Sequence, residues 1–200
     1  MSNVPVIGLD HLHVATVTTD NTTEVVYGTA QRILNITQAN INFNMESSTF
    51  FADNGPAVVY SQMGEVEVTI NVGDLTPSEY ALLTGTTRSS TTGVIDVTTE
   101  ANPPDMALGF RAMKSNGEYR YIWLMKGKFT LPNAEHQTKE SAVNFQPMQL
   151  TFSAVGRVND QKVMRRVDSD DENLPEGVTN TVLIDEWFAD PDYVPATPTT

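Results

Sequence analysis

Three histidines are the residues whose type and spacing most readily suggest chemistry. His11 and His13 are two positions apart and therefore share one face of an expected strand, where imidazole nitrogens could begin a zinc site. The third histidine, His136, lies in an expected loop, and the chain contains no cysteine. Because a zinc site needs several converging protein ligands, we interpret these side chains as ordinary strand or rim histidines and expect no metal site.

Paired carboxylates are the second chemical possibility, because general acid–base catalysis uses two carboxyl groups in different environments. Glu65 and Glu67 share a strand face, but the polar residues around them favour two solvated side chains. The acidic residues 168–172 offer oxygen ligands for calcium, yet the run lacks the central glycine and closing spacing of a calcium loop, so we interpret it as a solvated linker. The chain has neither a phosphate-binding glycine loop nor a nucleophile elbow. We therefore expect no catalytic residue and no cofactor.

The charge of the chain limits its partners. Twelve basic and 25 acidic side chains give a formal net charge of −13, whereas nucleic-acid binders use lysine and arginine to displace phosphate counterions. Nine of the acids and none of the bases lie in residues 168–200, so residues 1–167 carry only −4. The sequence has no run of 18 apolar residues and no signal pattern, so we expect folding in a reducing cytoplasm and no membrane partner.

Two segments alternate polar and apolar residues, which is typical of strands with one buried and one solvated face. The polar positions in residues 38–46 and 65–72 are Gln38, Asn40, Asn42, Asn44, Glu46, Glu65, Glu67, Thr69 and Asn71. Residues 47–64 between the two segments contain Asp53-Asn54-Gly55-Pro56, a strong turn signal. We expect a long hairpin with an ordered or projecting loop.

Further strands are indicated by runs of β-branched and aromatic residues. Residues 105–115 and 118–131 are expected to form a second hairpin around Asn116-Gly117. An early strand is expected at residues 11–18 and a late one at residues 141–155, with a bulge near Pro147 where the polar alternation changes phase. The chain is therefore expected to be mainly β.

Two helices are expected beside these strands. Thr76, Pro77 and Glu79 have the N-cap, first-position and third-position residue types of a helix start, and Gly85 is a suitable stop. A short C-terminal helix is expected at residues 181–189, with three apolar side chains as candidates for docking: Val182, Ile184 and Phe188. The domain organisation that follows is an N-terminal arm (1–10), a β domain (11–158), a C-terminal arm with the short helix (159–190) and a flexible tail (191–200).

Residues 107–129, ALGFRAMKSNGEYRYIWLMKGKF, resemble a segment of the major tail proteins of phages that have long, non-contractile tails and infect Gram-positive bacteria. The resemblance continues in order along nearly the whole chain, at residues 8–9, 27–29, 51–55, 64–68, 74–75, 82–85, 139–141 and 185–188. The acidic, proline-containing C-terminal tail departs from the pattern of that family.

The resemblance implies a fold, a function and a set of partners. The implied fold is a β-sandwich or barrel with one flanking α-helix and a short C-terminal helix, and each subunit would contribute about four strands to a continuous inner barrel. The implied function is structural: homo-hexameric rings stack into a tail tube through which double-stranded DNA passes to the host without specific binding. Expected partners are the tape measure, tail-tip and tail-terminator proteins, and the expected location is the virion tail, assembled in the host bacterial cytoplasm.

On this expectation, the nine polar residues of the two alternating strands are candidates for the wall of the bore, since they include no lysine or arginine. The alternative is that they face the exterior of the sandwich. Aromatic and aliphatic residues of the expected loop are candidates for contacts between rings, or else fold over their own domain: Phe50, Phe51, Val58, Val59 and Tyr60. Three arginines, Arg157, Arg165 and Arg166, are candidates for bridging neighbouring subunits, and Arg165 and Arg166 beside the acidic run could instead lie solvated.

Two other functions fit a β-rich chain of this kind. The first is a host- or carbohydrate-binding β-sandwich module of a phage tail, which would use a cluster of aromatic side chains. Trp123 and Trp187 are far apart in the sequence, and we expect them in the core or in a docking contact. The second is a tube protein of a type VI secretion-like system, which would share the architecture but not the sequence of residues 110–129.

Overall fold

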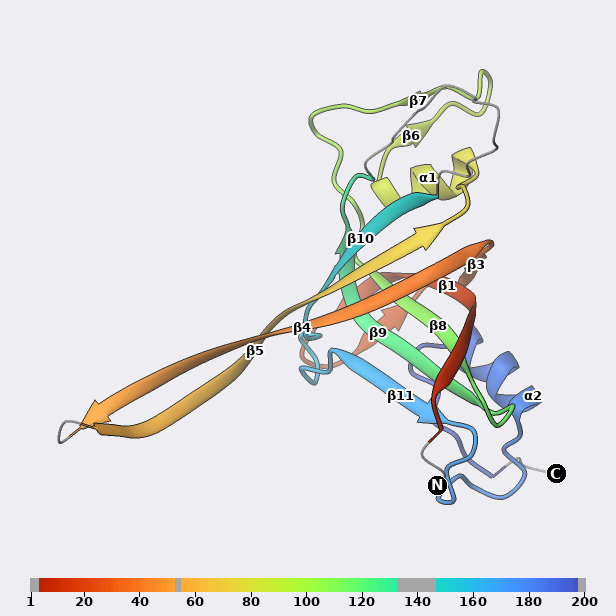
Figure 1. The fold of residues 1–200 in the computed structure, drawn as a ribbon. Coiled ribbons are helices and arrows are strands. Elements are labelled where there is room, and N and C mark those ends of the chain that lie inside the picture. Colours follow the sequence, from red (N-terminus) through yellow and green to blue (C-terminus); the bar gives the residue numbers. More distant parts are fainter. Residues whose placement is uncertain (1–3, 53–54, 133–146, 198–200) are drawn as a thin grey trace, which may run out of the picture.

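The computed structural model describes residues 4–52, 55–132 and 147–197 (Figure 1). The protein is mainly β, with 51% of its residues in strands and 10% in helices, as the sequence predicts. Seven strands form a continuous order, β2-β1-β8-β9-β10-β5-β4, while β11 pairs with β9 and β3 pairs with β1. The strands are β1 (Val6–Asp20), β2 (Val25–Tyr27), β3 (Gln31–Ile33), β4 (Ile36–Ala52), β5 (Gly55–Val72), β8 (Met106–Lys114), β9 (Tyr119–Phe129), β10 (Met148–Ala154) and β11 (Met164–Asp168).

The remaining elements lie beside this nine-stranded sheet. Strands β6 (Thr87–Arg88) and β7 (Ile95–Asp96) form a separate two-stranded sheet next to helix α1 (Pro77–Thr84), at one end of the molecule in Figure 1. Helix α2 (Asn180–Val182) continues into a π-helical turn, η1 (Leu183–Trp187), at the other end. Strands β1 and β4 are far apart in the strand order yet contact each other, so the sheet curls around its inner face.

The inner face of the curled sheet holds the main core. Its buried side chains come from six strands and from α1, and include Leu12, Val14, Ile33, Val66, Val68, Ile70, Val72, Leu83, Met106, Leu108, Ile122, Leu124, Phe129, Leu150 and Phe152. On β5 and β10 these are alternate residues, because successive side chains of a strand point to opposite faces. On β5 the apolar half of the predicted alternation is therefore the half that the core buries, whereas Phe43 and Met45 of β4 stay exposed.

The outer face of the sheet is covered at one end by the C-terminal helix. Tyr121, Trp123 and Met125 of β9 are fully buried there under Leu183, Trp187 and Phe188. The Trp123 indole donates a hydrogen bond of 2.7 Å to the Trp187 carbonyl, which satisfies a polar group inside this second core. Of the side chains predicted to dock, Phe188 is buried, but Val182 and Ile184 are only half-buried, because the helical turn directs Leu183 and Trp187 inward instead.

The hairpin of β4 and β5 is longer than the sequence predicts. Its strands have 17 and 18 residues, and the outer half projects from the domain as a twisted ribbon (Figure 1). The prediction of a loop at residues 47–64 is wrong, because strand pairing continues through this segment as far as Ala52 and Gly55. Register shifts next to Met45 and Phe51 interrupt the simple alternation, so the period-two pattern fades where the strands continue.

The local signals for the other elements are confirmed. Strands β8 and β9 form a hairpin around Asn116-Gly117, with Gly117 at φ 86°. In α1, the Thr76 hydroxyl accepts a hydrogen bond from the Glu79 N–H at 3.3 Å, and the Glu79 carboxylate accepts one from the Thr76 N–H at 2.7 Å. Gly85 ends this helix in the left-handed region at φ 67°. These features depend on neighbouring residues, which explains why the sequence predicts them.

The predicted terminal segments are joined to the sheet. Strand β1 confirms the early strand but begins at Val6, inside the expected N-terminal arm, and β11 and the C-terminal helix lie within residues 159–190. Strand β10 confirms the second half of the late strand, while residues 133–146, with the first half, lie outside the described part of the chain. His136 also falls in that segment.

A substitution at Gly127 tests the packing of β9 against β10. A Cβ atom there would lie 2.3 Å from the Ser153 carbonyl oxygen and 2.6 Å from the Phe152 ring. We expect Gly127→Ala to lower the free energy of unfolding by about 1–3 kcal/mol, because the clash involves backbone. Urea unfolding monitored by tryptophan fluorescence measures it, and Gly55→Ala, whose Cβ would meet nothing within 4 Å, is the matched control. Equal unfolding midpoints for the two variants would contradict the close packing.

Candidate functional site

A polar face covers the outside of β4 and β5, opposite the main core. Cross-strand pairs bring the predicted residues together: Gln38 with Asn71, Asn40 with Thr69 and Asn42 with Glu67. The Asn71 amide donates a hydrogen bond of 3.0 Å to the Gln38 amide oxygen. The side chains on this face are exposed or half-buried, in contrast to Val66, Val68, Ile70 and Val72 on the other side of β5.

The polar face extends over two further strands. Gln149, Thr151 and Ser153 of β10 pair with Asn71, Thr69 and Glu67 of β5, and all three are exposed or half-buried. Ser153 also pairs with Lys128 of β9, so one row crosses four strands as Asn42, Glu67, Ser153 and Lys128. A register shift between the pairs Met106–Gly127 and Leu108–Leu124 lets β9 contribute Lys128 to the polar face while Phe129 enters the core. The face therefore includes a cation that the two alternating strands alone do not contain.

Asn44, Glu46 and Glu65 extend this face toward the projecting ribbon. All three are exposed, and the register places Gly64 and Glu65 together opposite Asn44, as in a β-bulge. The structure thus brings the nine sequence-predicted polar residues onto one continuous outer surface of the hairpin.

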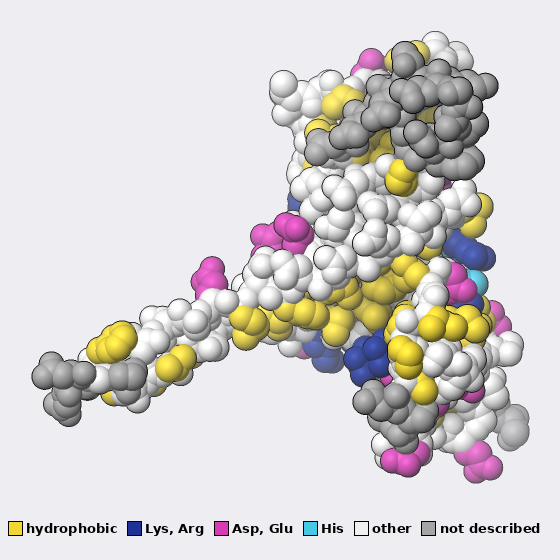
Figure 2. Space-filling view, viewed as in Figure 1, with side chains coloured by type: hydrophobic (Ala, Val, Ile, Leu, Met, Phe, Trp, Pro, Cys, Tyr) yellow, Lys and Arg dark blue, Asp and Glu magenta, His cyan; other side chains and the backbone are white. Residues whose placement is uncertain are grey.

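The outer half of the hairpin exposes large apolar side chains. The five predicted residues, Phe50, Phe51, Val58, Val59 and Tyr60, are between 59% and 67% exposed, and Met45 is 61% exposed. Figure 2 shows hydrophobic side chains distributed along the projecting ribbon. A two-stranded ribbon is marginally stable by itself, and it carries its apolar groups in water here. The arrangement suits an intermolecular contact, because isolated apolar groups gain stability when a partner covers them.

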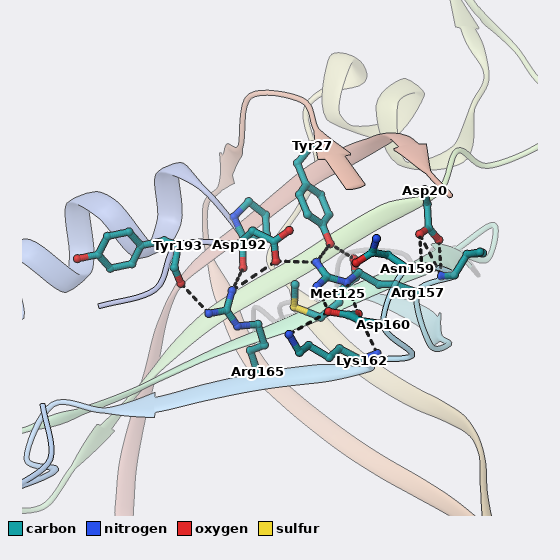
Figure 3. Close-up of polar contacts among 12 residues, drawn as sticks. Asp20, Tyr27, Met125, Arg157, Asn159, Asp160, Lys162, Arg165, Asp192 and Tyr193 are labelled. Carbon is teal, nitrogen blue, oxygen red and sulfur yellow. Dashed lines mark hydrogen bonds and ion pairs between the residues drawn. The ribbon is translucent and has the colours of Figure 1, made fainter. Parts of the chain in front are cut away.

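A network of charged residues holds the C-terminal segment against the sheet (Figure 3). Arg157 is buried and donates hydrogen bonds to Asp160 at 2.9 and 2.5 Å, to Asp192 at 2.6 Å and to the Tyr27 hydroxyl at 3.1 Å. Hydrogen bonds from Arg157 hold the pKa of Asp160 well below its usual range. Burial raises the pKa of Tyr27 to about 12, so the phenol stays neutral beside these groups.

The three arginines predicted to bridge subunits differ in their surroundings. Arg157 donates four hydrogen bonds to residues of its own subunit. Arg165 donates to the Pro191 and Tyr193 carbonyl oxygens at 3.0 and 2.8 Å. These two side chains connect parts of one chain. Arg166 is half exposed, with its Nε 3.4 Å from Asp168, so it retains the more accessible guanidinium.

The acidic run at residues 168–172 is not the solvated linker that the sequence predicts. Asp168 ends β11 and is buried, with a two-fold contact to Arg120 at 2.9 Å and an ion pair to Lys114 at 2.8 Å. Lys114 is also buried and makes a second, short ion pair with Asp170. Pairing along β8, β9 and β11 brings these distant residues together, which explains why spacing in the sequence does not predict the cluster.

His11 and His13 lie on β1, as the sequence predicts, and their rings stack with that of Phe188. The His13 ring lies 4.3 Å from the Phe188 ring in a stacked arrangement, and burial lowers the pKa of His13 to about 4. His11 adopts φ 53° at a register shift of β1, and its ring stacks 6.2 Å from that of His13. Within residues 4–52, 55–132 and 147–197, no three His, Asp or Glu side chains are grouped as metal ligands. In the same residues, no helix has the length and apolar character that a membrane crossing requires.

Comparison with known proteins identifies one family. A family model described as phage tail tube protein matches residues 7–189, which include every strand of the curled sheet except the first residue of β1. No curated protein matches the sequence.

The buried ion cluster of Asp168 predicts a dependence of stability on pH. Burial alone would raise the pKa of Asp168, but hydrogen bonds from Arg120 and Lys114 outweigh it and lower the pKa from 3.8 to about 2. The resulting stabilisation is present above pH 3.8 and is lost as the pH falls toward 2.

We therefore expect Asp168→Asn to lower the free energy of unfolding by about 2 kcal/mol at pH 7. Between pH 4 and pH 2, the free energy of unfolding should fall less in this variant than in the wild type. Chemical denaturation across this pH range measures both effects. Asp96→Asn, which removes an exposed carboxylate of β7, serves as the control. If the two variants have the same stability at pH 7, Asp168 does not contribute through its ion pairs.

Proposed function

Because the chain belongs to the phage tail tube protein family, we propose that six copies form a ring and that the rings stack into the tube of a long, non-contractile phage tail. Membership of the family makes the chain a structural, non-enzymatic component of the virion tail. In the proposed assembly, the tube encloses the tape measure protein, is bounded by tail-tip and tail-terminator proteins, and conducts double-stranded DNA into a Gram-positive host. The subunits fold and assemble in the host cytoplasm.

The four-strand polar face is the observation that carries this proposal. Strands β4, β5, β10 and β9 are neighbours in one sheet and present polar side chains on the same side, opposite the main core. Four strands from each of six subunits make an inner barrel of about 24 strands, and at ~4.8 Å spacing and ~40° tilt its backbone diameter is roughly 48 Å. Inward side chains leave a bore of roughly 35–40 Å, which passes a DNA duplex roughly 20 Å wide with a layer of water.

Closure of the ring also explains the long edge of the sheet. Strand β4 is the last strand of the order and has 17 residues, so an isolated subunit presents an extended row of backbone hydrogen-bonding groups. An exposed edge of this kind promotes pairing with another chain. Pairing of β4 with a neighbouring subunit removes the edge and continues the polar face around the bore.

The projecting ribbon supplies the contact between rings in this proposal. It extends well beyond the domain and carries apolar side chains on an otherwise weakly charged segment (Figure 2). Burial of Phe50 and Tyr60 against a neighbouring copy would provide the aromatic centre that strong protein interfaces contain. The monomer does not depend on these exposed side chains for its own core.

The ribbon is tested by Phe50→Ser, Val58→Ser and Tyr60→Ser in one variant. We expect a folded subunit with an unchanged unfolding midpoint, because these side chains are more than half exposed, but no tubes, because the apolar contact is lost. Negative-stain microscopy of concentrated protein measures tube formation. The control, Val94→Ser with Val97→Ser, removes two similarly exposed side chains near the small sheet and should leave the tubes intact. Tubes of normal length from the ribbon variant would exclude this contact.

The lining of the bore is tested by reversing charge on the polar face. Glu65→Lys with Glu67→Lys should leave the tubes intact but slow DNA release from triggered virions by about tenfold or more at low salt, because lysines capture phosphates. Higher salt should restore much of the rate, since counterions compete with the phosphates. The control, Asp96→Lys with Glu100→Lys, makes the same change of charge at two exposed positions off the nine-stranded sheet. Release at the wild-type rate by the Glu65 and Glu67 variant would place this face outside the bore.

A further inference from the structure

Lys128 is an exception on a face that otherwise has no exposed cation among its paired residues. It stands in the row Asn42, Glu67, Ser153 and Lys128, and 45% of its side chain is exposed. Its neighbour Phe129 packs in the main core, so the backbone fixes the side of the sheet from which Lys128 extends. If this face lines the bore, six copies of Lys128 form a circle of ammonium groups in every ring.

One carboxylate is placed between Lys128 and the next lysine of the strand. The Asp105 carboxylate lies 3.7 Å from the Lys128 Nζ through one oxygen and 3.7 Å from the Lys126 Nζ through the other. Lys128 also donates a hydrogen bond of 3.1 Å to the Asn102 amide oxygen. Both acceptors come from the segment that leads into β8, so this segment supplies the groups that hold the ammonium.

Asp20 pairs with Lys126 and therefore cannot replace Asp105 as the partner of Lys128. It lies 2.7 Å from the Lys126 Nζ and accepts hydrogen bonds from the Val158 and Asn159 N–H groups. Only 4% of its side chain is exposed, against 38% for Asp105. The Lys126–Asp20 pair is thus a buried structural contact, and Asp105 is left as the counter-charge of Lys128 at the surface.

Glu67 is not the ion-pair partner of Lys128. Ser153 of β10 stands between the two residues in the row. Among the described residues, the carboxylate within 4 Å of the Lys128 ammonium belongs to Asp105, at 3.7 Å. The electrostatic character of this part of the face therefore depends on Asp105.

Resting on the proposed function, we propose that the Asp105 carboxylate neutralises Lys128 in the bore. It thereby keeps this lysine from capturing the phosphates of passing DNA. Loss of the carboxylate would expose an uncompensated positive charge on each subunit. A phosphate group would then replace the carboxylate as the partner of Lys128, and repetition around each ring and along the tube would multiply the effect. The wild-type ion pair instead leaves the lysine available to position the segment before β8 without attracting DNA.

The test compares tubes assembled from purified full-length chains and sedimented with a labelled short DNA duplex. Wild-type tubes should leave the duplex in solution at about 50 mM salt, whereas Asp105→Asn tubes should retain at least about tenfold more and release it by about 200 mM. Adding Lys128→Gln to Asp105→Asn should abolish the retention. Asp96→Asn, with the same change in net charge away from the nine-stranded sheet, should behave as the wild type.

Each outcome has a separate meaning. Retention by Asp105→Asn no greater than by Asp96→Asn, or retention that persists after Lys128→Gln is added, overturns the role of Asp105 while leaving the tube proposal intact. Absence of tubes from the wild-type chain contradicts the proposed function itself. Should Asp105→Asn fail to polymerise alone, tubes co-assembled with wild-type chains carry the same test: retention must rise with the fraction of variant, and a flat response overturns the proposal.

Discussion

The registers of β5 with β4 and β10 are the constraint on which the rest of the structure depends. Successive side chains of a strand face opposite sides, so these registers decide together which residues enter the main core and which form the polar face. A slip of one residue would place Glu67 and Thr69 in the core and Val66 and Val68 in water. Burial of four valine and isoleucine side chains along β5 opposes such a slip, because each contributes about 1.5–3 kcal/mol when removed from water. The same apolar contacts that stabilise the domain therefore determine the surface proposed to meet DNA.

The outer face of the sheet is divided between two uses. At the end formed by β1, β8, β9 and β11, the C-terminal helix covers Tyr121 and Trp123, and the contacts of Arg157 and Arg165 hold the segment that follows it (Figure 3). At the other end, β10, β5 and β4 leave the face open and polar. A register shift in β9 lies between the two regions and changes which residues point outward. One sheet thus presents an intramolecular packing surface and an accessible surface side by side.

Charge in this protein is more organised than its net value of −13 suggests. Buried Arg157 and Lys114 each contact two carboxylates, and Asp20 and Asp105 accompany Lys126 and Lys128. Removing one member of a buried pair leaves its partner uncompensated, which is costlier than losing an exposed pair. Arg157, Lys114, Lys126 and Lys128 are consequently engaged in contacts within the chain.

The sequence by itself determined the features that depend on residues close together in the chain. The alternation in β4 and β5, the Asn116-Gly117 turn and the capping box of Thr76 and Glu79 follow from side-chain periodicity and from hydrogen bonds within a few residues. The resemblance of residues 107–129 to a family of tail proteins also needed no structure. The nine polar residues of the two strands were predicted as one surface for the same reason, since period-two spacing specifies a common face.

Only the tertiary structure decided which distant groups meet. Lys128 reaches the polar face through a register shift, Asp105 reaches Lys128 from the preceding segment, and Asp192 reaches Arg157 across 35 positions of sequence. The continuation of β4 and β5 into a projecting ribbon was also missed, because pairing between two strands can persist where the alternation within each is interrupted. Residue spacing cannot specify these contacts, since strand order and bulges set which side chains lie next to one another in space.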